Sequence, residues 1–296
     1  MYVIAGATGN TGHAISESLL ATGKKVKAIV RNKAKAQKLA DQGAEILEGG
    51  LDDAAFLSKA FAGATAVYIL IPPRMDAVDF PAYQAAMGEA QVRALHEAKV
   101  PYAVHLSSMG AHTPVGTGVV AGLFHQERRL NRLPHTHVLH LRAGYFMENM
   151  LASIPMLKHQ NMLGGALAAD AKMAFIATKD IADYAVKRLL SLDFSGKEVQ
   201  ELLGSRDATP GEFTSVLASA VGKAGAKWIQ FPDQDFVQAL QGFGISASVA
   251  QGYVGLSRSV NEGRLQVIER DASNTTATSP EDFARTVFKP AYEASP

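Results

Sequence analysis

The stretch VIAGATGNTG, residues 3–12, joins a short apolar run to three glycines, Gly6, Gly9 and Gly12. Glycine permits the positive φ of a tight strand-to-helix turn, and its missing Cβ lets a phosphate group approach backbone N–H groups. The first turn of the helix that follows offers unpaired N–H groups and a partial positive charge, which suit a diphosphate. The stretch therefore predicts a nucleotide-binding turn, with polar side chains between the glycines from Thr8, Asn10 and Thr11.

The glycine spacing is GxxGxxG, whereas many dinucleotide-binding dehydrogenases have GxGxxG. A tight turn that binds no ligand would need the same glycines. An apolar strand precedes them, a helix follows, and KVKAIV at 25–30 supplies the next strand. This βαβ context favours the nucleotide-binding interpretation.

Arg31 stands at the expected end of the second strand, 19 residues after Gly12. An acidic residue near this position would bind the ribose diol of NAD, whereas an arginine offers a planar set of donors to the 2′-phosphate of NADP. Lys33 and Lys35 follow and strengthen the positive field. The alternative is a solvated basic cluster at the start of a helix. The arginine favours NADPH over NADH as the cofactor.

Strand-like and helix-like segments alternate through the first half of the chain, which predicts parallel strands joined by right-handed crossovers. The expected fold is α/β, a Rossmann-like, doubly wound parallel sheet that binds ligands beyond the carboxyl ends of its strands. Expected strands are 3–5, 25–30, 44–49, 66–71, 102–108 and 136–142, and expected helices include 10–22, 33–42, 80–99 and about 119–133.

The alternation loosens after about residue 150. Residues 173–191 predict one more strand and a helix led by Asp180, and helices start at Thr209 and Ser279. We therefore expect residues 1–150 to form the dinucleotide-binding part, with 173–192 returning to it. Residues 151–172 and 193–296 would form a smaller, mainly helical part on the substrate side.

Composition narrows the class of protein. The chain has 296 residues, 47% hydrophobic and 19% charged, with a net charge of +1 and no cysteine. These values are typical of a globular enzyme, give no reason to expect nucleic acid or an anionic membrane as partner, and exclude disulfides and thiolate chemistry. Met1 leads directly into a strand and no long apolar segment occurs, so we expect a cytoplasmic protein.

Several stretches together resemble the NmrA-like branch of the atypical short-chain dehydrogenases/reductases. They are VIAGATGNTG at 3–12, VKAIVRN at 26–32, YILIPP at 68–73, HLSSMGA at 105–111, HLRAGYFMENM at 140–150 and FIATKDIADYAV at 175–186. That branch includes NADPH-dependent quinone reductases, triphenylmethane dye reductases and non-catalytic regulators that sense the redox state of a dinucleotide.

The resemblance implies a role for particular residues. Gly6, Thr8, Gly9, Asn10 and Thr11 would hold the pyrophosphate, with Gly12 completing the loop, and Arg31 would hold the 2′-phosphate. Ile71, Pro72 and Ser107 would line the path to the nicotinamide, and Tyr145, Phe146 and Asn149 would stand on the nicotinamide and substrate side. The alternative for Tyr145 and Phe146 is packing in the core beneath the smaller part.

The chain departs from the family pattern in two places. Gly50 occupies the position where an aspartate often follows the third strand, so adenine contacts would come from the backbone or from Asp52. The Tyr-x-x-x-Lys pair of ordinary short-chain dehydrogenases, which supplies their proton donor, is absent. Reduction of a quinone or a conjugated cation tolerates this loss, because the acceptor is already electrophilic and water can supply the proton.

Two functions remain open at this stage. The first is NADPH-dependent hydride transfer to a small flat electrophile such as a quinone, and the second is a non-catalytic, NADP(H)-binding regulator. We expect a small-molecule substrate and a monomer or homodimer, with a protein partner only if the chain is a regulator. His125 and Tyr145 are the catalytic candidates, although an exposed helical histidine without such a role is common. His135, His137 and His140 lack a nearby carboxylate, so we expect no metal site.

Overall fold

A seven-stranded sheet forms the centre of the molecule in the computed structural model, which describes residues 1–265 and 268–295. Its strands lie in the order β10-β6-β5-β4-β1-β2-β3, and every neighbouring pair is parallel. The order reverses between β1 and β4, which is where a doubly wound sheet opens a crevice for a ligand. The bounds are β1 Tyr2–Ala5, β2 Val26–Val30, β3 Glu45–Glu48, β4 Ala66–Leu70, β5 Tyr102–Ser108, β6 His137–Ala143 and β10 Lys197–Leu202.

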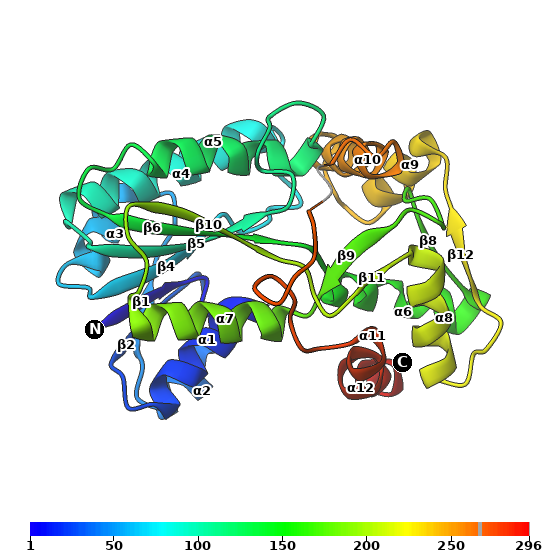
Figure 1. Cartoon of the computed structure of the whole chain (residues 1–296), viewed down its shortest axis with the longest axis horizontal. Coiled ribbons are helices and arrows are strands. Elements are labelled where there is room, and N and C mark those ends of the chain that lie inside the picture. Colours follow the sequence, from blue (N-terminus) through cyan, green and yellow to red (C-terminus); the bar gives the residue numbers. More distant parts are fainter. Residues whose placement is uncertain (266–267, 296) are drawn as a thin grey trace.

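Helices cover both faces of this sheet (Figure 1). One face carries α1 (Asn10–Ala21), α2 (Gln37–Asp41) and α7 (Thr178–Ser191), and the other carries α3 (Ala54–Phe61), α4 (Phe80–Glu97) and α5 (Ala121–Leu130). The β1 strand is buried on both sides, since Ile4 packs in the core under α1 and α7 whereas Val3 packs in the core under α3 and α4. A strand covered on both faces reads as a continuous apolar run, and this confirms the predicted fold class.

A smaller part lies at one end of the sheet (Figure 1). It contains a three-stranded sheet of β7, β9 and β11, a parallel pair of β8 and β12, and helices around a core of Phe175, Phe213, Phe283 and Phe288. Its strands are β7 Tyr145–Phe146, β8 Met162–Gly165, β9 Met173–Ile176, β11 Asp207–Ala208 and β12 Lys227–Gln230. Its helices are η3 Met147–Ser153, α6 Ile154–Gln160, α8 Pro210–Ala220, α9 Asp233–Gly242, α10 Ala247–Asn261, α11 Pro280–Phe283, η4 Ala284–Phe288 and α12 Lys289–Ala294.

Two strands lie elsewhere than the sequence indicates. β9 falls in the segment 173–192 that was expected to return to the dinucleotide-binding part, yet it pairs with β7 and β11, and only α7 returns. β10 falls in the segment 193–296 assigned to the smaller part, yet it pairs with β6 at the edge of the main sheet. Its sequence, KEVQEL, is mostly polar, with only Val199 and Leu202 apolar, and lacks the apolar run of the central strands.

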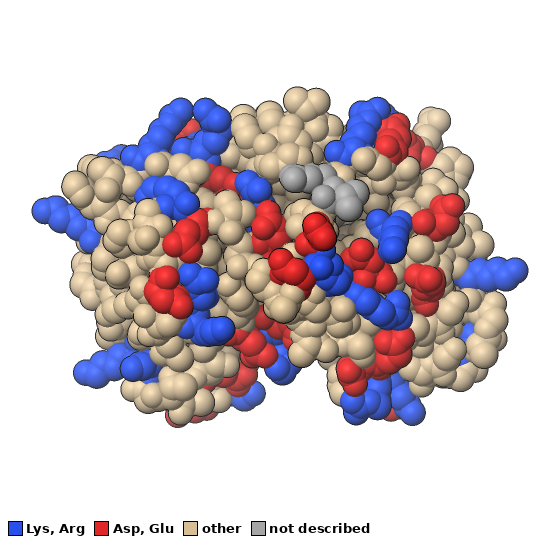
Figure 2. Space-filling view, in the orientation of Figure 1, with Lys and Arg blue, Asp and Glu red and all other residues tan. Residues whose placement is uncertain are grey.

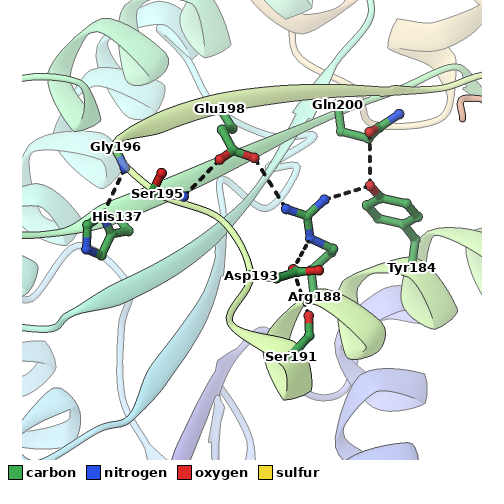
Figure 3. Close-up of polar contacts among 9 residues, drawn as sticks. All are labelled: His137, Tyr184, Arg188, Ser191, Asp193, Ser195, Gly196, Glu198 and Gln200. Atoms are coloured by element: carbon green, nitrogen blue, oxygen red, sulfur yellow. Dashed lines mark hydrogen bonds and ion pairs between the residues drawn. The ribbon is translucent and has the colours of Figure 1, made fainter.

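A cluster of polar side chains holds β10 and the turn before it against α7 (Figure 3). Arg188 pairs with Asp193 at 2.7 Å and with Glu198 at 3.3 Å. It also donates to the Tyr184 hydroxyl, which in turn donates to Gln200 Oε1 at 2.9 Å. Because these contacts involve α7, the turn and the edge strand together, they fix β10 in place without an apolar face.

Several helices begin at a residue whose side chain caps the first turn. Asp53 caps α3 by accepting from the Phe56 N–H at 2.9 Å, and Thr209 forms a complete capping box with Glu212 on α8. The expectation that Asp180 leads α7 is wrong, because Ala177 precedes the first turn and Asp180 instead accepts hydrogen bonds from Thr278. The predicted helix 33–42 is divided into a 3₁₀ turn, η1 (Lys33–Ala36), and α2, and the predicted 119–133 begins with another, η2 (Gly118–Val120).

None of the helices in the described part of the chain is long and apolar enough to cross a membrane. On the face shown in Figure 2, lysine and arginine side chains are interspersed with aspartate and glutamate over both parts of the molecule. That face therefore offers no broad basic surface of the kind that binds nucleic acid.

Candidate functional site

The glycine loop lies where β1 ends and α1 begins. Gly6 has a φ of +64°, which a side chain would strain. A Cβ on Gly12 would lie 2.4 Å from the Gly6 carbonyl oxygen, so the helix packs on the loop only because this residue is glycine. Gly9 precedes the helix in an extended conformation and donates its N–H to Gly6 O at 2.9 Å. The three glycines thus close a compact turn at the carboxyl end of the central strand.

The amino end of α1 is left without a cap. Gly9 offers no side chain, and the first hydrogen bond of the helix joins the His13 N–H to Gly9 O at 2.9 Å. The N–H groups of Asn10, Thr11 and Gly12 therefore have no acceptor among residues 1–265 and 268–295. The start of this twelve-residue helix therefore has the unpaired N–H groups that suit a phosphate group.

The polar side chains of the loop have different surroundings. Thr8 and Asn10 are exposed. The Thr11 side chain is buried, and its hydroxyl accepts a hydrogen bond from Tyr68 on β4 at 2.9 Å. This hydroxyl therefore faces the core rather than the turn, and only the backbone N–H of Thr11 is available to a phosphate.

Arg31 follows β2 directly and is exposed, with no hydrogen bond or ion pair to the rest of the described chain. Its charge acts on Tyr83 of α4, whose pKa is raised by burial, an effect that the charges of Arg31 and Arg74 partly offset. Arg74 also stacks over the Tyr83 ring, with its guanidinium carbon 5.8 Å from the ring centre. The negative charge of Asp52 raises the pKa of the same tyrosine. The charges of Arg31, which follows β2, of Arg74, which follows β4, and of Asp52 thus all act on Tyr83.

Ile71 and Pro72 begin the loop that follows β4, next to the glycine loop because β4 and β1 are neighbours. Both are partly buried. The Tyr83 hydroxyl donates to the Pro72 carbonyl oxygen at 3.0 Å, and Gln91 donates to the Leu70 carbonyl oxygen at 2.9 Å. These two bonds from α4 fix the path of the loop as it leaves the sheet.

Ser107 does not present its hydroxyl to the crevice. It is buried and donates to Glu127 Oε1 on α5 at 2.6 Å. Glu127 also pairs with Arg142 of β6 through two bonds of 2.7 and 3.0 Å. Hydrogen bonding to the carboxylate raises the pKa of Arg142 further. This buried set of charges joins α5 to β5 and β6, so the Ser107 side chain is part of the fold's support.

Tyr145, Phe146 and Asn149 lie just beyond the carboxyl end of β6. Phe146 packs against the core of the main sheet and Tyr145 against the core of the smaller part, with the Tyr145 and Phe175 rings 5.6 Å apart. Core packing, the alternative for these two aromatic residues, is therefore present. The Tyr145 hydroxyl also meets the exposed Asn149 side chain.

Tyr145 is a hydrogen-bonding group rather than an acid at neutral pH. Burial raises its pKa to about 12, and the neighbouring Tyr253 of α10 adds to this effect. A phenol with such a pKa stays protonated across the neutral range and donates a hydrogen bond. Sequence reasoning missed Tyr253, because no spacing in the sequence brings residue 253 to residue 145.

Glu148 is another residue that the sequence did not single out. Its carboxylate accepts from the Thr178 N–H at 2.9 Å and from the Thr178 hydroxyl at 2.6 Å, at the start of α7. Burial raises the pKa of Glu148, whereas these bonds lower it. The contact ties the segment that carries Tyr145 and Asn149 to the main body. Glutamate in a helix-like stretch is too common to have indicated this role.

His125, the other catalytic candidate, is exposed on α5. It lines a cavity of about 210 Å³ between α4, α5 and α10, together with Gln84, Arg129 and Ser248. The loop glycines, Arg31, Tyr145 and Asn149 are not among the residues that line this cavity. The structure thus gives His125 surroundings separate from those of the other predicted site residues.

A buried histidine pair lies in the sheet. His105 Nδ1 and His140 Nδ1 are 3.0 Å apart, and His140 Nε2 meets Asn131 Oδ1 at 2.9 Å. Because the amide oxygen is an acceptor, His140 carries its proton on Nε2. His140 Nδ1 then accepts, and His105 donates to it from Nδ1. The buried Nε2 of His105 has no partner in the described chain. Burial lowers the pKa of His140 to about 4 and that of His105 well below its usual value. Within the described residues no cluster of three or more potential ligands could hold a metal ion.

Comparison with known proteins agrees with this architecture. Quinone oxidoreductase 2 of Escherichia coli is 30% identical over 252 residues, which cover 84% of each chain. An NAD(P)H azoreductase of Xenophilus azovorans is 26% identical over 254 residues, again 84% of each. The crystal structure of an NADPH-dependent quinone oxidoreductase of Escherichia coli complexed with NADPH has 26% identity and a TM-score of 0.77, covering 97% of this chain and 100% of that one.

Triphenylmethane reductase of Citrobacter sp. shares the fold, with a TM-score of 0.80 at 18% identity over 98% of this chain and 99% of that one. Residues 2–270 match the sequence model of the NmrA-like family. That match spans the main sheet and the smaller part as far as α10, and it places this chain in the NmrA-like family.

Proposed function

We propose that the protein is an NADPH-dependent reductase that transfers a hydride to a small, flat electrophile such as a quinone. The observation that carries this proposal is the uncapped start of α1 after β1, together with the exposed Arg31 that follows the neighbouring strand β2. The first feature suits a diphosphate and the second suits an additional phosphate on the ribose. The quinone reductase and azoreductase relatives support the same class of reaction.

The residues present fit such a dinucleotide. Unpaired N–H groups of Asn10, Thr11 and Gly12 would bind the diphosphate, and the glycines leave room for it to approach the backbone. Arg31, with Arg74 and Tyr83 nearby, would bind the adenosine end. Ile71 and Pro72 would then line the middle of the crevice, and Phe146 and Asn149 its far end.

NADPH would supply a hydride from its nicotinamide ring. The protein's own part is to hold the acceptor against that ring, exclude water and provide hydrogen bonds to the acceptor, because no Tyr-x-x-x-Lys pair supplies an acid. An electrophilic acceptor gains its proton from solvent after reduction. The phenol of Tyr145 remains protonated and serves as a hydrogen-bond donor.

The experiment is to follow NADPH absorbance in the presence of a panel of quinones, with NADPH binding measured separately by calorimetry. The proposal expects turnover of at least one quinone and binding at micromolar concentration. Binding without turnover of any acceptor would instead support the non-catalytic regulator, for which the likeness to the regulator NmrA, at 16% identity, supplies only the shared fold.

A further inference from the structure

The loop before α10 is fastened to the loop that follows β4. The Ser246 N–H donates to the Met75 carbonyl oxygen at 2.8 Å, and the Ser246 hydroxyl donates to the Ala77 carbonyl oxygen at 2.5 Å. The Phe80 N–H donates to Ser248 Oγ at 3.0 Å. These bonds join segments that are far apart in the sequence. They give α10 a defined position next to the loop at the carboxyl end of β4.

α10 also packs closely on η2, the short helix that follows β5. A Cβ on Gly118 would lie 2.0 Å from the Gly252 carbonyl oxygen, and one on Gly252 would lie 2.8 Å from a methyl carbon of Val119. Only glycine at these two positions allows the helices to approach so closely. The position of α10 is therefore fixed by backbone contact as well as by hydrogen bonds.

Tyr253 lies on α10 and packs against the loop that follows β4. Its ring packs with the buried side chains of Ala77, Phe80 and Val249, and its hydroxyl meets Met75 Sδ at 3.9 Å. It also lies near the hydroxyl of Tyr145, in β7, which follows β6. α10 thus reaches the segments beyond β4, β5 and β6. Arg31, beyond β2, lies on the other side of β1.

In the sheet order Arg31 and the segments that α10 contacts thus lie on opposite sides of β1, and Tyr83 of α4 packs in the same cluster as Tyr253. The arginine on the β2 side marks the adenosine end of the proposed dinucleotide site, so the β4–β6 side beneath α10 is where the reacting ring and the acceptor would meet. Tyr253, on α10, is the phenol of the smaller part that would lie on this β4–β6 side. A thioether sulfur at 3.9 Å is a weak acceptor, and the described chain gives the Tyr253 hydroxyl no stronger one.

We propose that Tyr253 donates a hydrogen bond to a carbonyl oxygen of the acceptor and so makes the site selective for flat acceptors that carry such an oxygen, as quinones do. This inference rests on the proposed function. Addition of a hydride to the quinone leaves negative charge on its oxygen, the cofactor is oxidised by two electrons, and water supplies the remaining proton. Tyr253 keeps its own proton throughout, since burial raises the pKa of its hydroxyl. Its contribution is a hydrogen bond that strengthens as the charge develops.

The test compares Tyr253→Phe with the unaltered protein on two acceptors. One is a naphthoquinone, and the other is a cationic triphenylmethane dye whose central carbon accepts the hydride and which has no carbonyl oxygen. We expect kcat/KM for the quinone to fall about three- to tenfold, the fold-change expected for one lost hydrogen bond. The value for the dye and the Kd for NADPH should remain within twofold.

Tyr292→Phe is the matched control. It removes another phenol hydroxyl, on α12, that makes no hydrogen bond in the described part of the chain. An unchanged quinone reaction in Tyr253→Phe, or an equal fall for quinone and dye, would overturn the proposal.

A second readout separates this inference from the proposed function. Calorimetric titration of the NADP⁺ complex with the naphthoquinone measures acceptor binding without turnover, and Tyr253→Phe should weaken that binding about three- to tenfold. If the unaltered protein reduces neither acceptor, the reductase proposal fails, while this titration still decides the role of Tyr253. Equal affinity of the unaltered protein and of Tyr253→Phe for the naphthoquinone would reject the proposed hydrogen bond from Tyr253.

Discussion

Ser246 donates its hydroxyl to the carbonyl oxygen of Ala77, a residue 169 positions earlier in the chain, at 2.5 Å. The same hydroxyl accepts from the Val249 N–H at 3.2 Å and so caps α10. One side chain therefore both starts this helix and binds it to the loop beyond β4. A helix of the C-terminal part is in this way held against the loop that follows a central strand of the N-terminal part.

Ser246→Ala should lower the free energy of unfolding by about 0.5–2 kcal/mol, because it removes the cap and the contact with Ala77 together. Hydrogen exchange at the first turn of α10 should accelerate. Ser215→Ala on α8, which removes a hydroxyl bonded only to Gly211 O within its own helix, is the control and should leave α10 exchange unchanged. Slow exchange at α10 in Ser246→Ala would show that other contacts hold the helix.

Ser107→Ala should reduce stability rather than dinucleotide affinity. The lost hydrogen bond to the Glu127 carboxylate costs about 1.5–3 kcal/mol, since the acceptor is charged and buried. NADPH affinity should stay within twofold in a calorimetric titration. The neighbouring Ser108→Ala, whose hydroxyl meets only Met109 O, should change the stability less. Loss of NADPH affinity at unchanged stability would return Ser107 to the role that the family resemblance implies.

The buried histidine pair should make the protein less stable in mild acid. Burial holds the pKa of His140 at about 4 and that of His105 well below 6.5, so the unfolded chain binds protons that the folded protein does not as the pH falls below 6.5. The full free energy of unfolding is therefore present above pH 6.5. Below that pH it falls by about 1.4 kcal/mol for each unit that the pH decreases, for each histidine. For His140 this loss ends near pH 4.

Urea unfolding between pH 7.5 and pH 4.5 checks this dependence. His105→Phe should have a shallower decline than the unaltered protein, because it removes one of the two titrating groups. His112→Gln, at an exposed position, should keep the full decline. The same slope in His105→Phe and in the unaltered protein would show that other groups cause the loss.

Local signals in the sequence were sufficient for six of the seven strands of the main sheet, β1 to β6, and for the glycine turn. Gly6 and Gly12 have the turn geometry and close packing that the motif predicts, and the wholly apolar β4 is covered on both faces. Arg31 lies at the end of β2 as its spacing indicates. In each case a single segment contains the whole pattern.

The remainder depends on contacts between distant segments. KEVQEL does not look like a strand of a buried sheet, and the Arg188 cluster that holds β10 combines residues from a helix, a turn and the strand. Ser107 is positioned by a charge on α5, and Tyr253 packs against the loop beyond β4 because α10 is fastened to that loop. Such placements are set by packing, which periodicity and spacing do not encode.

The most direct test is a calorimetric titration of the unaltered protein and of Arg31→Glu with NADPH and with NADH, with Arg132→Glu, another exposed arginine, as control. We predict that the unaltered protein and the control bind NADPH more tightly than NADH. In Arg31→Glu the NADPH affinity should fall about ten- to a hundredfold, the effect of losing a charge-assisted hydrogen bond, while NADH affinity changes little. No heat with either nucleotide, or an unchanged ratio of the two affinities in Arg31→Glu, would contradict the account.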